Sequence, residues 1–347
     1  MATTRLRIAA GVLLTLAGLE LLCRLLPVST ATLTGYHGDP ELLTYPPGHR
    51  WVASTGWDLR NPQRLQANAQ GFLADHDFVR DPDAVALIGD SYVEGSMLDA
   101  DARAGAQLER LLPGRKVFAM GSPGTALLDY AQRIRWAHEN YGVRDMVLLL
   151  ERSDARQVRC GSGNVHSRCL DPATLESRVQ RLPEPGPFKR LARHSALLQY
   201  LFGQVKLDGR HFLAEMLTRQ APAADVGARA RVAPSAAALA AERRVIDAAV
   251  QEFFRVAKPH VAGRLVILVD GLRSPAGRPE GADEFQRAHL IDALRRGGAD
   301  VVDLEPVYAR HGAVSPLSLD VGPYDGHLNR LGLALAMKAG ADALHTP

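Results

Sequence analysis

The chain has 347 residues, of which 46% are hydrophobic, so it is long enough to bury a sizeable core in one large domain or two small ones. Its 41 basic and 38 acidic side chains leave a formal net charge of +3, and no basic run is interleaved with aromatic residues. This balance argues against a nucleic-acid-binding protein and favours a globular protein that carries an additional N-terminal segment.

Residues 1–27 are predicted to form a membrane signal anchor. Arg5 and Arg7 precede a long apolar stretch, and residues 8–26 approach the roughly 20 residues that a membrane-spanning helix needs. Positive charge collects on the cytoplasmic side of such helices, so the rest of the chain is expected on the far side. The pattern predicts a single-pass protein of the inner membrane, attached through residues 8–26, with its folded part in the periplasm.

Two charged residues interrupt this apolar stretch. Glu20 and Arg24 are four residues apart on a helix, so they are expected to pair or to extend toward the outer interface. The alternative to an uncleaved anchor is a signal peptide that is removed, with cleavage after Ala31 and Ser29 at the minus-three position. Cys23 follows a leucine where a lipoprotein signal needs a small residue, so lipidation is not expected.

A lead-in at 28–80 separates the anchor from the rest of the chain. Gly, Pro, Trp and Asn recur in it at irregular spacing, which predicts an extended path with turns and little regular structure. From residue 81 onward, short apolar runs alternate with helical patterns, and the segment 81–347 is predicted to be one catalytic domain.

The alternation within this domain predicts an α/β fold. Strands are expected at 84–89, 116–120, 145–151, 264–270 and 299–304. Helices are expected at about 99–112, 125–140, 236–258 and 284–297, with a last helix after Asn329. Such a pattern is typical of a doubly wound, flavodoxin-like parallel sheet, here of five strands, with helices on both faces.

The alternation stops after the third strand and resumes near 236, so a segment at about 155–235 is predicted to be an insertion. It contains one probable helix, FKRLARHSALLQYLFGQV at 188–205. It also contains Cys160 and Cys169, which are an even pair once Cys23 is assigned to the apolar segment. An oxidising periplasm favours a disulfide between them.

Two alternatives to this disulfide stay open. The two cysteines are either free thiols or part of a metal site, for which His166 is the one histidine nearby in the sequence. A single histidine makes the metal site the weaker alternative, and we expect no metal in this protein.

Gly89-Asp90-Ser91 follows the first predicted strand. Ligands of a doubly wound sheet bind outside the carboxyl ends of its strands, so this serine lies where chemistry is expected. Its hydroxyl would lie near the N–H groups that begin the next helix, and these can stabilise an oxyanion. The alternative is an ordinary helix N-cap, for which Asp and Ser are both preferred, with Glu94 as a capping-box carboxylate. Asp270, at a later strand end, either touches substrate or forms an Asp-Gly turn.

A serine becomes a nucleophile only if a base accepts its proton. His327 is the best candidate among the twelve histidines, because it lies in a turn-rich segment between the last strand and the last helix, two residues after Asp325. An aspartate that close can orient the imidazole and stabilise its protonated form. The chain order Ser, then Asp and His near the end, therefore predicts a triad of Ser91, Asp325 and His327.

Three blocks of the sequence together resemble the SGNH, or GDSL-type, hydrolase family. GDS at 89–91 matches the first block of that family, GSPGT at 121–125 the second and DGHLN at 325–329 the last. The lead-in is similar to that of membrane-anchored bacterial members, in which an apolar helix and a stretch like ANAQGF, here 67–72, precede the first block. The resemblance covers most of 81–347 outside the insertion.

The resemblance implies a role for each matching residue. Ser91 would be the nucleophile, His327 its base and Asp325 the residue that orients the base. In the family, the N–H groups of the serine and of a second-block glycine join a third-block asparagine in an oxyanion hole. This implies Ser91, Gly124 and the residue at the asparagine position, Ser153, as the oxyanion-hole residues.

The chain departs from the family pattern twice. The third block, LLLERSDAR, has Ser153 and then Asp154 where the family has Asn-Asp, and a serine hydroxyl is a shorter donor than an amide. Loss of one oxyanion donor costs on the order of 3 kcal/mol in the transition state. The spacing Asp325-x-His327 is shorter than the usual Asp-x-x-His and resembles that of the SGNH-like domains of polysaccharide O-acetyltransferases and of some anchored esterases.

The sequence thus predicts an acyl-ester hydrolase that forms an acyl-enzyme and needs no cofactor. Its anchor favours an acylated glycan or lipid of the cell envelope as substrate. Two alternatives are an O-acyltransferase of the same fold and a non-catalytic SGNH-like module that binds glycan or assists envelope assembly. A flavodoxin-like cofactor binder is disfavoured, because neither GDS nor GSPGT has a phosphate-loop pattern.

Overall fold

The computed structural model describes residues 2–30, 32–182, 184–205, 235–273, 282–323 and 325–346. The chain folds into two compact units. The first, called the N-terminal unit below, comprises Met1–Thr32, Arg50–Leu65 and Pro183–Val232. The second, called the sheet unit, comprises Leu33–His49, Gln66–Leu182 and Ala233–Pro347. The predicted domain boundaries at residues 27 and 80 stay predictions.

The sheet unit is built on a parallel sheet of five strands. They are β5 (Val85–Gly89), β6 (Val117–Gly121), β7 (Asp145–Leu150), β10 (Leu265–Val269) and β11 (Asp300–Asp303). Their order is β11-β10-β7-β5-β6, and each neighbouring pair is parallel. Counted along the chain, this is the flavodoxin-like order 2-1-3-4-5, which reverses direction between β5 and β7. The predicted fold class is confirmed.

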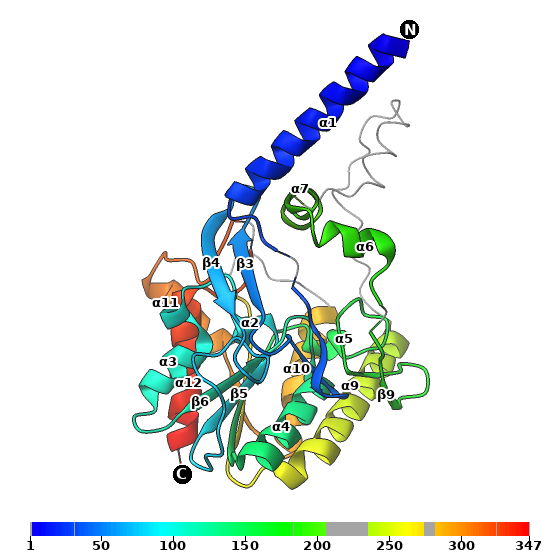
Figure 1. The fold of residues 1–347 in the computed structure, drawn as a ribbon. Coiled ribbons are helices and arrows are strands. Elements are labelled where there is room, and N and C mark those ends of the chain that lie inside the picture. The colour runs from blue at the N-terminus through cyan, green and yellow to red at the C-terminus, as the bar shows by residue number, and fades with distance from the viewer. Residues whose placement is uncertain are drawn as a thin grey trace. The chain divides into compact units, whose positions relative to one another are not determined.

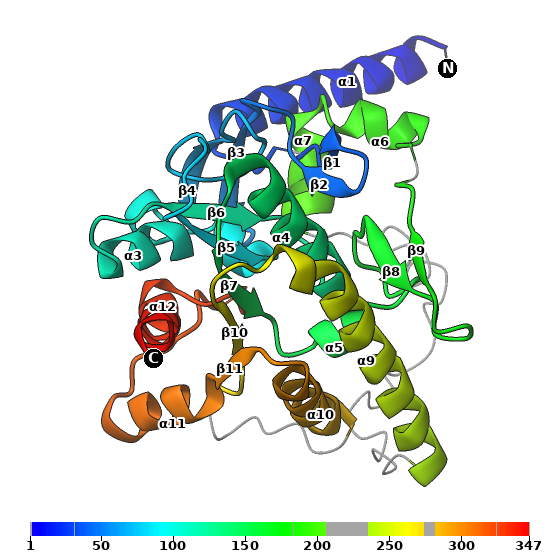
Figure 2. The same cartoon turned by 90° about the horizontal axis from the view of Figure 1, so that it is seen from below.

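Helices cover both faces of this sheet (Figure 1), as the view in Figure 2 makes clear. One face is covered by α4 (Leu127–Tyr141), α9 (Ala236–Ala257) and α10 (Ala282–Arg296), and the other by α3 (Ala104–Leu111), α11 (Glu305–Val314) and α12 (Arg330–His345). In β5, Ala86 and Ile88 pack toward the first group of helices, whereas Val85 and Leu87 pack toward the second. A strand buried on both faces is apolar at every position, which is why it was recognisable in the sequence.

Shorter elements connect these layers. They are α2 (Ser91–Glu94), η1 (Ala100–Ala102), α5 (Asp154–Gln157), the antiparallel pair β8 (Arg168–Leu170) and β9 (Ser177–Val179), and η3 (Lys258–His260). Helix α11 was not predicted from the sequence. The predicted insertion contains α5, β8 and β9 within the sheet unit.

The lead-in has more regular structure than the sequence suggested. It contains β1 (Gly35–Asp39) paired with β2 (Leu42–Thr44), and β3 (Arg50–Thr55) paired with β4 (Arg60–Gln66). The expectation of little regular structure was therefore wrong. Each pair is an isolated two-stranded ribbon held by backbone hydrogen bonds, and such ribbons do not need the sustained apolar alternation that identifies strands in a sequence.

The N-terminal unit begins with α1 (Ala2–Leu25). Among the helices that the structure describes, its segment Thr3–Leu25 is long and apolar enough to cross a membrane, with a mean hydropathy of 1.9. A segment of this kind serves either as an anchor or as a signal sequence. Arg24 Nε lies 2.7 Å from Glu20 Oε1, which confirms the expected pairing. The alternative cleavage point after Ala31 lies outside the described residues.

The helix expected at 188–205 is broken into three short pieces. These are α6 (Pro187–Ala192), α7 (Ala196–Leu198) and the π-helical turn η2 (Gln199–Gln204). The break falls at Ser195, whose side chain accepts a hydrogen bond from the Leu198 N–H and so begins a new helix as its N-cap. The stretch is otherwise periodic, and this periodicity predicted one helix; the N-cap at Ser195 divides it.

Candidate active site

Ser91 is the first residue of α2 and lies two residues after Gly89, the last residue of β5. Asp90 precedes it as the N-cap, and the Asp90 carboxylate accepts a hydrogen bond of 2.8 Å from the Tyr92 N–H. Asp90 therefore caps the N-terminus of α2, and the Ser91 hydroxyl has a different partner. The helix is a single turn that ends at Gly95, in the left-handed region at φ 62°.

The Ser91 hydroxyl is hydrogen-bonded to His327, although the two residues are 236 positions apart in the chain. The distance from Ser91 Oγ to His327 Nε2 is 2.8 Å, and His327 Nδ1 lies 2.5 Å from Asp325 Oδ1. The same carboxylate oxygen accepts the His327 backbone N–H at 2.8 Å. The structure thus brings the three predicted residues together in the geometry that a nucleophile, its base and an orienting carboxylate require.

The electrostatic surroundings of His327 favour its protonated form. Burial by itself lowers the pKa of His327, but the hydrogen bond and charge of Asp325 raise it, and the charges of Asp90 and Glu94 add to this. The net pKa lies above the ordinary value. An imidazole that gains stability on protonation is suited to accept a proton from a serine hydroxyl.

Arg273 braces the loop that carries the histidine. Its guanidinium donates hydrogen bonds to four groups: Asp270 Oδ2 at 2.6 Å, the Tyr92 hydroxyl at 2.6 Å, the Gly326 carbonyl at 2.5 Å, and the Asp320 carboxylate. Burial lowers the pKa of Arg273, but the charges of Asp270 and Tyr92 and the hydrogen bonds to Asp270 and Asp320 together raise it by more, so the net pKa is raised. Asp270 is itself buried, and its carboxylate holds this arginine, so it helps to brace the loop; the expected substrate contact stays a prediction.

Tyr92 links this brace to the imidazole of His327. Its ring centroid lies 5.1 Å from that of His327, and the Arg273 guanidinium carbon lies 5.4 Å from the Tyr92 ring. Neither residue was predicted from the sequence, because a lone tyrosine and a lone arginine belong to none of the three motif blocks. The one available signal was their position within a few residues of a strand end.

We expect Arg273→Lys to lower kcat by about 10²-fold with little change in KM, because misplacing a catalytic group by about 1 Å has an effect of that size. A lysine carries a single compact charge and cannot reach four acceptors in one plane. Steady-state kinetics on a soluble ester measure the effect. Arg330→Lys, in an exposed ion pair with Asp101, is the matched control and should leave kcat unchanged. Equal losses in both variants would contradict the bracing role.

Arg133 contacts the first and the second motif block and holds them together. Its side chain is fully buried and donates to the Gly89 carbonyl at 2.7 Å, the Met120 carbonyl at 3.3 Å and the Thr125 hydroxyl at 2.9 Å. These acceptors lie at the ends of β5 and β6 and in the GSPGT segment. Arg133 thus fixes the separation between the Ser91 and Gly124 segments.

The glycines of the second block permit a close approach. A Cβ added to Gly121 would lie 2.2 Å from the Glu94 backbone nitrogen, so only glycine lets α2 pack this tightly on β6. Gly124 has a φ of 76°, in the left-handed region that favours glycine. In the part of the chain that the structure describes, the Gly124 N–H makes no hydrogen bond, so it is able to serve as an oxyanion donor. The Ser91 N–H is likewise one that a helix start leaves without an intrahelical acceptor.

Ser153 follows β7, next to β5 in the sheet, but its hydroxyl is already engaged. Ser153 Oγ donates to the Glu151 carboxylate and accepts from Gln157 Nε2 at 2.7 Å. The neighbouring Asp154 is fully buried; burial raises its pKa, and the charge of Asp90 raises it further. The role of Ser153 in an oxyanion hole stays a prediction.

We expect Ser153→Ala to lower kcat by less than about 10-fold, because removing a donor that is aimed at the oxyanion costs about 10² to 10³. The hydroxyl proton of Ser153 points to Glu151 instead. The kcat for a chromogenic acetyl ester measures the effect, and Ser315→Ala, at the C-terminal end of α11, is the control. A loss of 10²-fold or more would show that Ser153 turns from Glu151 to the oxyanion during the reaction.

Glu94 does not form the capping box that the sequence suggested. That expectation was wrong, because the cap is Asp90 and Glu94 is therefore one position too far along α2. Glu94 is buried, and its carboxylate accepts hydrogen bonds from the Tyr45 hydroxyl at 3.0 Å and from the Ser96 N–H at 2.9 Å.

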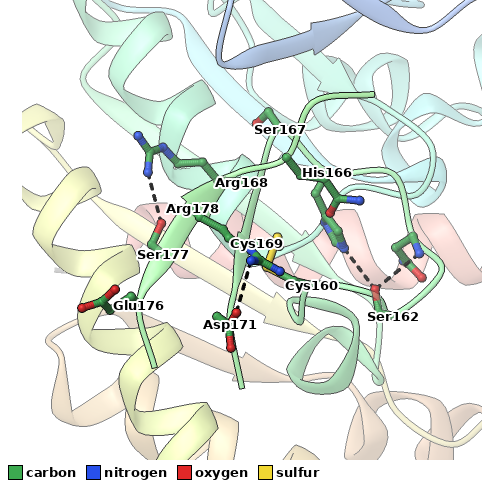
Figure 3. Close-up of a disulfide and its surroundings, with 12 residues drawn as sticks. Cys160, Ser162, His166, Ser167, Arg168, Cys169, Asp171, Glu176, Ser177 and Arg178 are labelled. Carbon is green, nitrogen blue, oxygen red and sulfur yellow. Dashed lines mark hydrogen bonds and ion pairs between the residues drawn. A yellow bond between two sulfur atoms is a disulfide. The ribbon is translucent and has the colours of Figure 1, made fainter. Parts of the chain in front are cut away.

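A loop closed by a disulfide lies against the second block. Cys160 and Cys169 are bonded, with Cα atoms 4.9 Å apart (Figure 3). Within the loop, the Val165 N–H donates to the Gly124 carbonyl at 3.0 Å. The loop therefore supports the backbone at Gly124.

Buried polar contacts fix the same loop to α4. His166 Nδ1 lies 3.1 Å from Asp129 Oδ2, and the Ser167 hydroxyl donates to Asp129 Oδ1 at 2.6 Å. Figure 3 shows His166 pointing toward Ser162, whose Oγ lies 3.1 Å from His166 Nε2. Among the described residues, no group of His, Cys, Asp and Glu side chains is arranged to hold a metal ion.

Replacing both disulfide cysteines by serine is expected to lower the free energy of unfolding by about 2–3 kcal/mol, because a short loop closed by a crosslink loses that much chain entropy in the unfolded state. Nine positions separate the two cysteines. Thermal unfolding under oxidising conditions measures the change. Addition of a reducing agent should lower the Tm of the wild type and leave the Tm of the Cys160→Ser/Cys169→Ser variant unchanged. An equal response of the two proteins would contradict the prediction.

Comparison with known proteins gives distant similarities. No family model and no curated protein matches the chain. Similar solved structures include LAE5, an alpha/beta hydrolase enzyme from the metagenome of Lake Arreo, Spain, at 13% identity over 78% of this chain and 99% of that one, with a TM-score of 0.41. A member of the lipolytic protein G-D-S-L family from Veillonella parvula has 10% identity over 75% and 96%, with a TM-score of 0.40. AlinE4, a SGNH-hydrolase family esterase, has 14% identity over 77% and 98%, with a TM-score of 0.31. At this distance, the function of the chain is inferred from its own residues.

Proposed function

We propose that this chain is a membrane-anchored ester hydrolase of the SGNH type that works through a serine acyl-enzyme. The observation that carries the proposal is the line of hydrogen bonds from Ser91 through His327 to Asp325 at the carboxyl end of β5. The three motif blocks of the sequence support it, because they supply these residues and Gly124 in the chain order of that family.

The reaction follows from the positions of these groups. His327 Nε2 accepts the Ser91 proton as Ser91 Oγ attacks the ester carbonyl carbon. The negative charge that forms on the carbonyl oxygen is stabilised by the N–H groups of Ser91 and Gly124. The ester C–O bond then breaks, and the leaving alkoxide takes the proton from His327. In the second half, His327 accepts a proton from water as the water oxygen attacks the acyl carbon. The bond between this carbon and Ser91 Oγ then breaks, His327 returns the proton to Ser91 Oγ, and the carboxylic acid leaves.

The proposed substrate is an acylated glycan or lipid of the cell envelope. Support comes from α1, whose arginines at its N-terminal end favour a cytoplasmic N-terminus. The disulfide between Cys160 and Cys169 supports an oxidising compartment such as the periplasm. Both features favour a single-pass inner-membrane protein with its site in the periplasm.

Two other functions have a supporting observation each. The short Asp325-x-His327 spacing favours an O-acyltransferase, in which a sugar hydroxyl replaces water as the acceptor. The engaged hydroxyl of Ser153 favours a non-catalytic module that binds glycan, because it leaves the oxyanion hole with one donor fewer than in relatives.

Labelling with a serine-directed fluorophosphonate tests these proposals. The full chain in detergent should be labelled, Ser91→Ala should not, and Ser96→Ala, five residues away, should be labelled like the wild type. Label together with hydrolysis of a chromogenic acetyl ester supports the hydrolase. Label without hydrolysis supports transfer to a specific acceptor, and absence of any label that depends on Ser91 supports the binding module.

A further inference from the structure

The helical segment of the N-terminal unit, residues 187–205, exposes large apolar side chains. Phe188 is 60% exposed, Leu191 63% and Phe202 45%. The rings of Phe188 and Phe202 contact each other with centroids 5.8 Å apart, so they form one patch although they come from different helical pieces. Clustered apolar side chains on a protein surface mark a site that binds another protein, a ligand or a membrane.

This segment is fixed to the C-terminal end of α1. The Glu20 carboxylate accepts three hydrogen bonds from it, from Ser195 Oγ at 2.7 Å, the Ala196 N–H at 3.1 Å and the Leu197 N–H at 2.9 Å. Arg24 Nη2 donates to the His194 carbonyl at 2.9 Å. The start of α7 and the last turns of α1 therefore form one hydrogen-bonded assembly.

The position of Glu20 on α1 sets the depth of this assembly. Glu20 lies five residues before Leu25, the last residue of α1, which corresponds to about 7–8 Å along a helix axis. If α1 spans a membrane, the Glu20 carboxylate lies near the outer boundary of the hydrocarbon, where an unpaired charge is costly. The donors from Ser195, Ala196 and Leu197 satisfy it, so those residues must lie at the same depth.

The charge of the segment complements an anionic surface. It contains Lys189, Arg190 and Arg193, and residues 187–205 include no Asp or Glu. Lys189 and Arg190 are exposed beside Phe188 and Leu191. Basic and large apolar side chains on one short helical stretch are the combination found in helices that lie in the headgroup layer of a bilayer.

We propose that residues 187–205 are a membrane-docking segment that lies in the outer headgroup layer beside α1. Phe188, Leu191 and Phe202 enter the boundary of the acyl chains, and the basic side chains contact the phosphates of anionic phospholipids. The segment thereby holds α1 at a fixed depth and satisfies the charge of Glu20. The inference rests on the proposed membrane anchoring by α1 and is independent of the proposed ester hydrolysis.

Nitroxide labels on the full chain in proteoliposomes of phosphatidylcholine and phosphatidylglycerol test the inference. Single cysteines are introduced by Phe188→Cys and Leu191→Cys in a Cys23→Ala background. Leu13→Cys, in the middle of α1, and Val314→Cys, which is 84% exposed in the sheet unit, are the controls. The ratio of collisions with oxygen to collisions with a water-soluble nickel chelate reports the depth of each label.

We expect this ratio to be severalfold higher at residues 188 and 191 than at 314, and highest at 13. A low ratio at 188 and 191 with a high ratio at 13 would overturn the docking segment and leave the anchor intact. A low ratio at 13 would overturn both. Dipolar broadening at 188 with a low ratio would mean that a second copy of the chain covers the patch, which also overturns the inference.

A charge reversal tests the contribution of the lipid headgroups. Lys189→Glu/Arg190→Glu should lower the oxygen-to-nickel ratio of a label at 191 in vesicles with phosphatidylglycerol and change it less in phosphatidylcholine alone. Arg295→Glu/Arg296→Glu, an exposed basic pair in α10, is the matched control and should leave the ratio unchanged. Hydrolysis of a soluble ester should be the same in all of these variants, which separates docking from the activity of Ser91. Equal ratios before and after the reversal in both lipids would show that the basic side chains do not contact the headgroups.

Discussion

Ser91→Ala and His327→Ala are each expected to lower kcat for hydrolysis of a chromogenic acetyl ester by about 10⁴-fold or more. The first variant has no nucleophile, and in the second no base accepts the proton of Ser91. Their hydrogen bond of 2.8 Å makes the two residues act as one unit. The double variant should therefore lose no more activity than either single variant. Steady-state kinetics of the three proteins in detergent measure these losses.

Ser96→Ala and His311→Ala are the matched controls for this cycle. Ser96 lies near the end of the same one-turn helix, and His311 lies on α11, where its ring contacts the Leu317 carbonyl. Both variants should keep wild-type kcat. Losses that add up in the Ser91/His327 double variant would mean that the two residues act independently, and the proposed proton transfer between them would be wrong.

The sheet and the pair Asp325 and His327 were predictable from the sequence because both leave local signals. A strand such as β5 is apolar at every position, and a serine that follows it lies at the carboxyl edge of the sheet. Asp325 and His327 are two residues apart, so their interaction is local. The contact of His327 with Ser91 is not local, and only the combination of blocks that resemble one family connected the two ends of the chain.

The groups that support the triad were not predictable, because they act through contacts that only the folded chain creates. Arg273 binds one carboxylate three residues away and another group, the Tyr92 hydroxyl, 181 residues away. Arg133 is a charged residue on a helix and would ordinarily be assigned to the surface, yet it is fully buried and bonded to backbone carbonyls. Neither arginine belongs to a motif, and side-chain type alone gives no indication of such a role.

Among the groups that raise the pKa of His327, Asp325 contributes most. Burial of His327 disfavours its positive charge, but the hydrogen bond and charge of Asp325, together with the charges of Asp90 and Glu94, favour it by more, so the net pKa of His327 is raised. The base must be neutral to accept the proton of Ser91. Activity of the free enzyme should therefore rise with pH as His327 loses its proton, and the midpoint of that rise should lie above the ordinary value for histidine.

Asp325→Asn is expected to lower kcat by about 10⁴-fold, because an amide holds the imidazole in the wrong tautomer without a large change in geometry. It should also move the acidic limb of the pH profile of kcat/KM to lower pH. The sign follows from the causes of the shift: without the charge of Asp325, burial lowers the pKa of His327, while the smaller contributions of Asp90 and Glu94 remain. The residual activity of the variant, measured across the pH range, gives both quantities.

Asp101→Asn provides the matched control for this profile. Asp101 pairs with Arg330 on the surface, with 63% of its side chain exposed. Its removal should leave both kcat and the acidic limb unchanged. If Asp325→Asn lowers kcat but keeps the limb at the wild-type pH, then Asp325 only orients the ring and the raised pKa of His327 has its origin in the charges of Asp90 and Glu94.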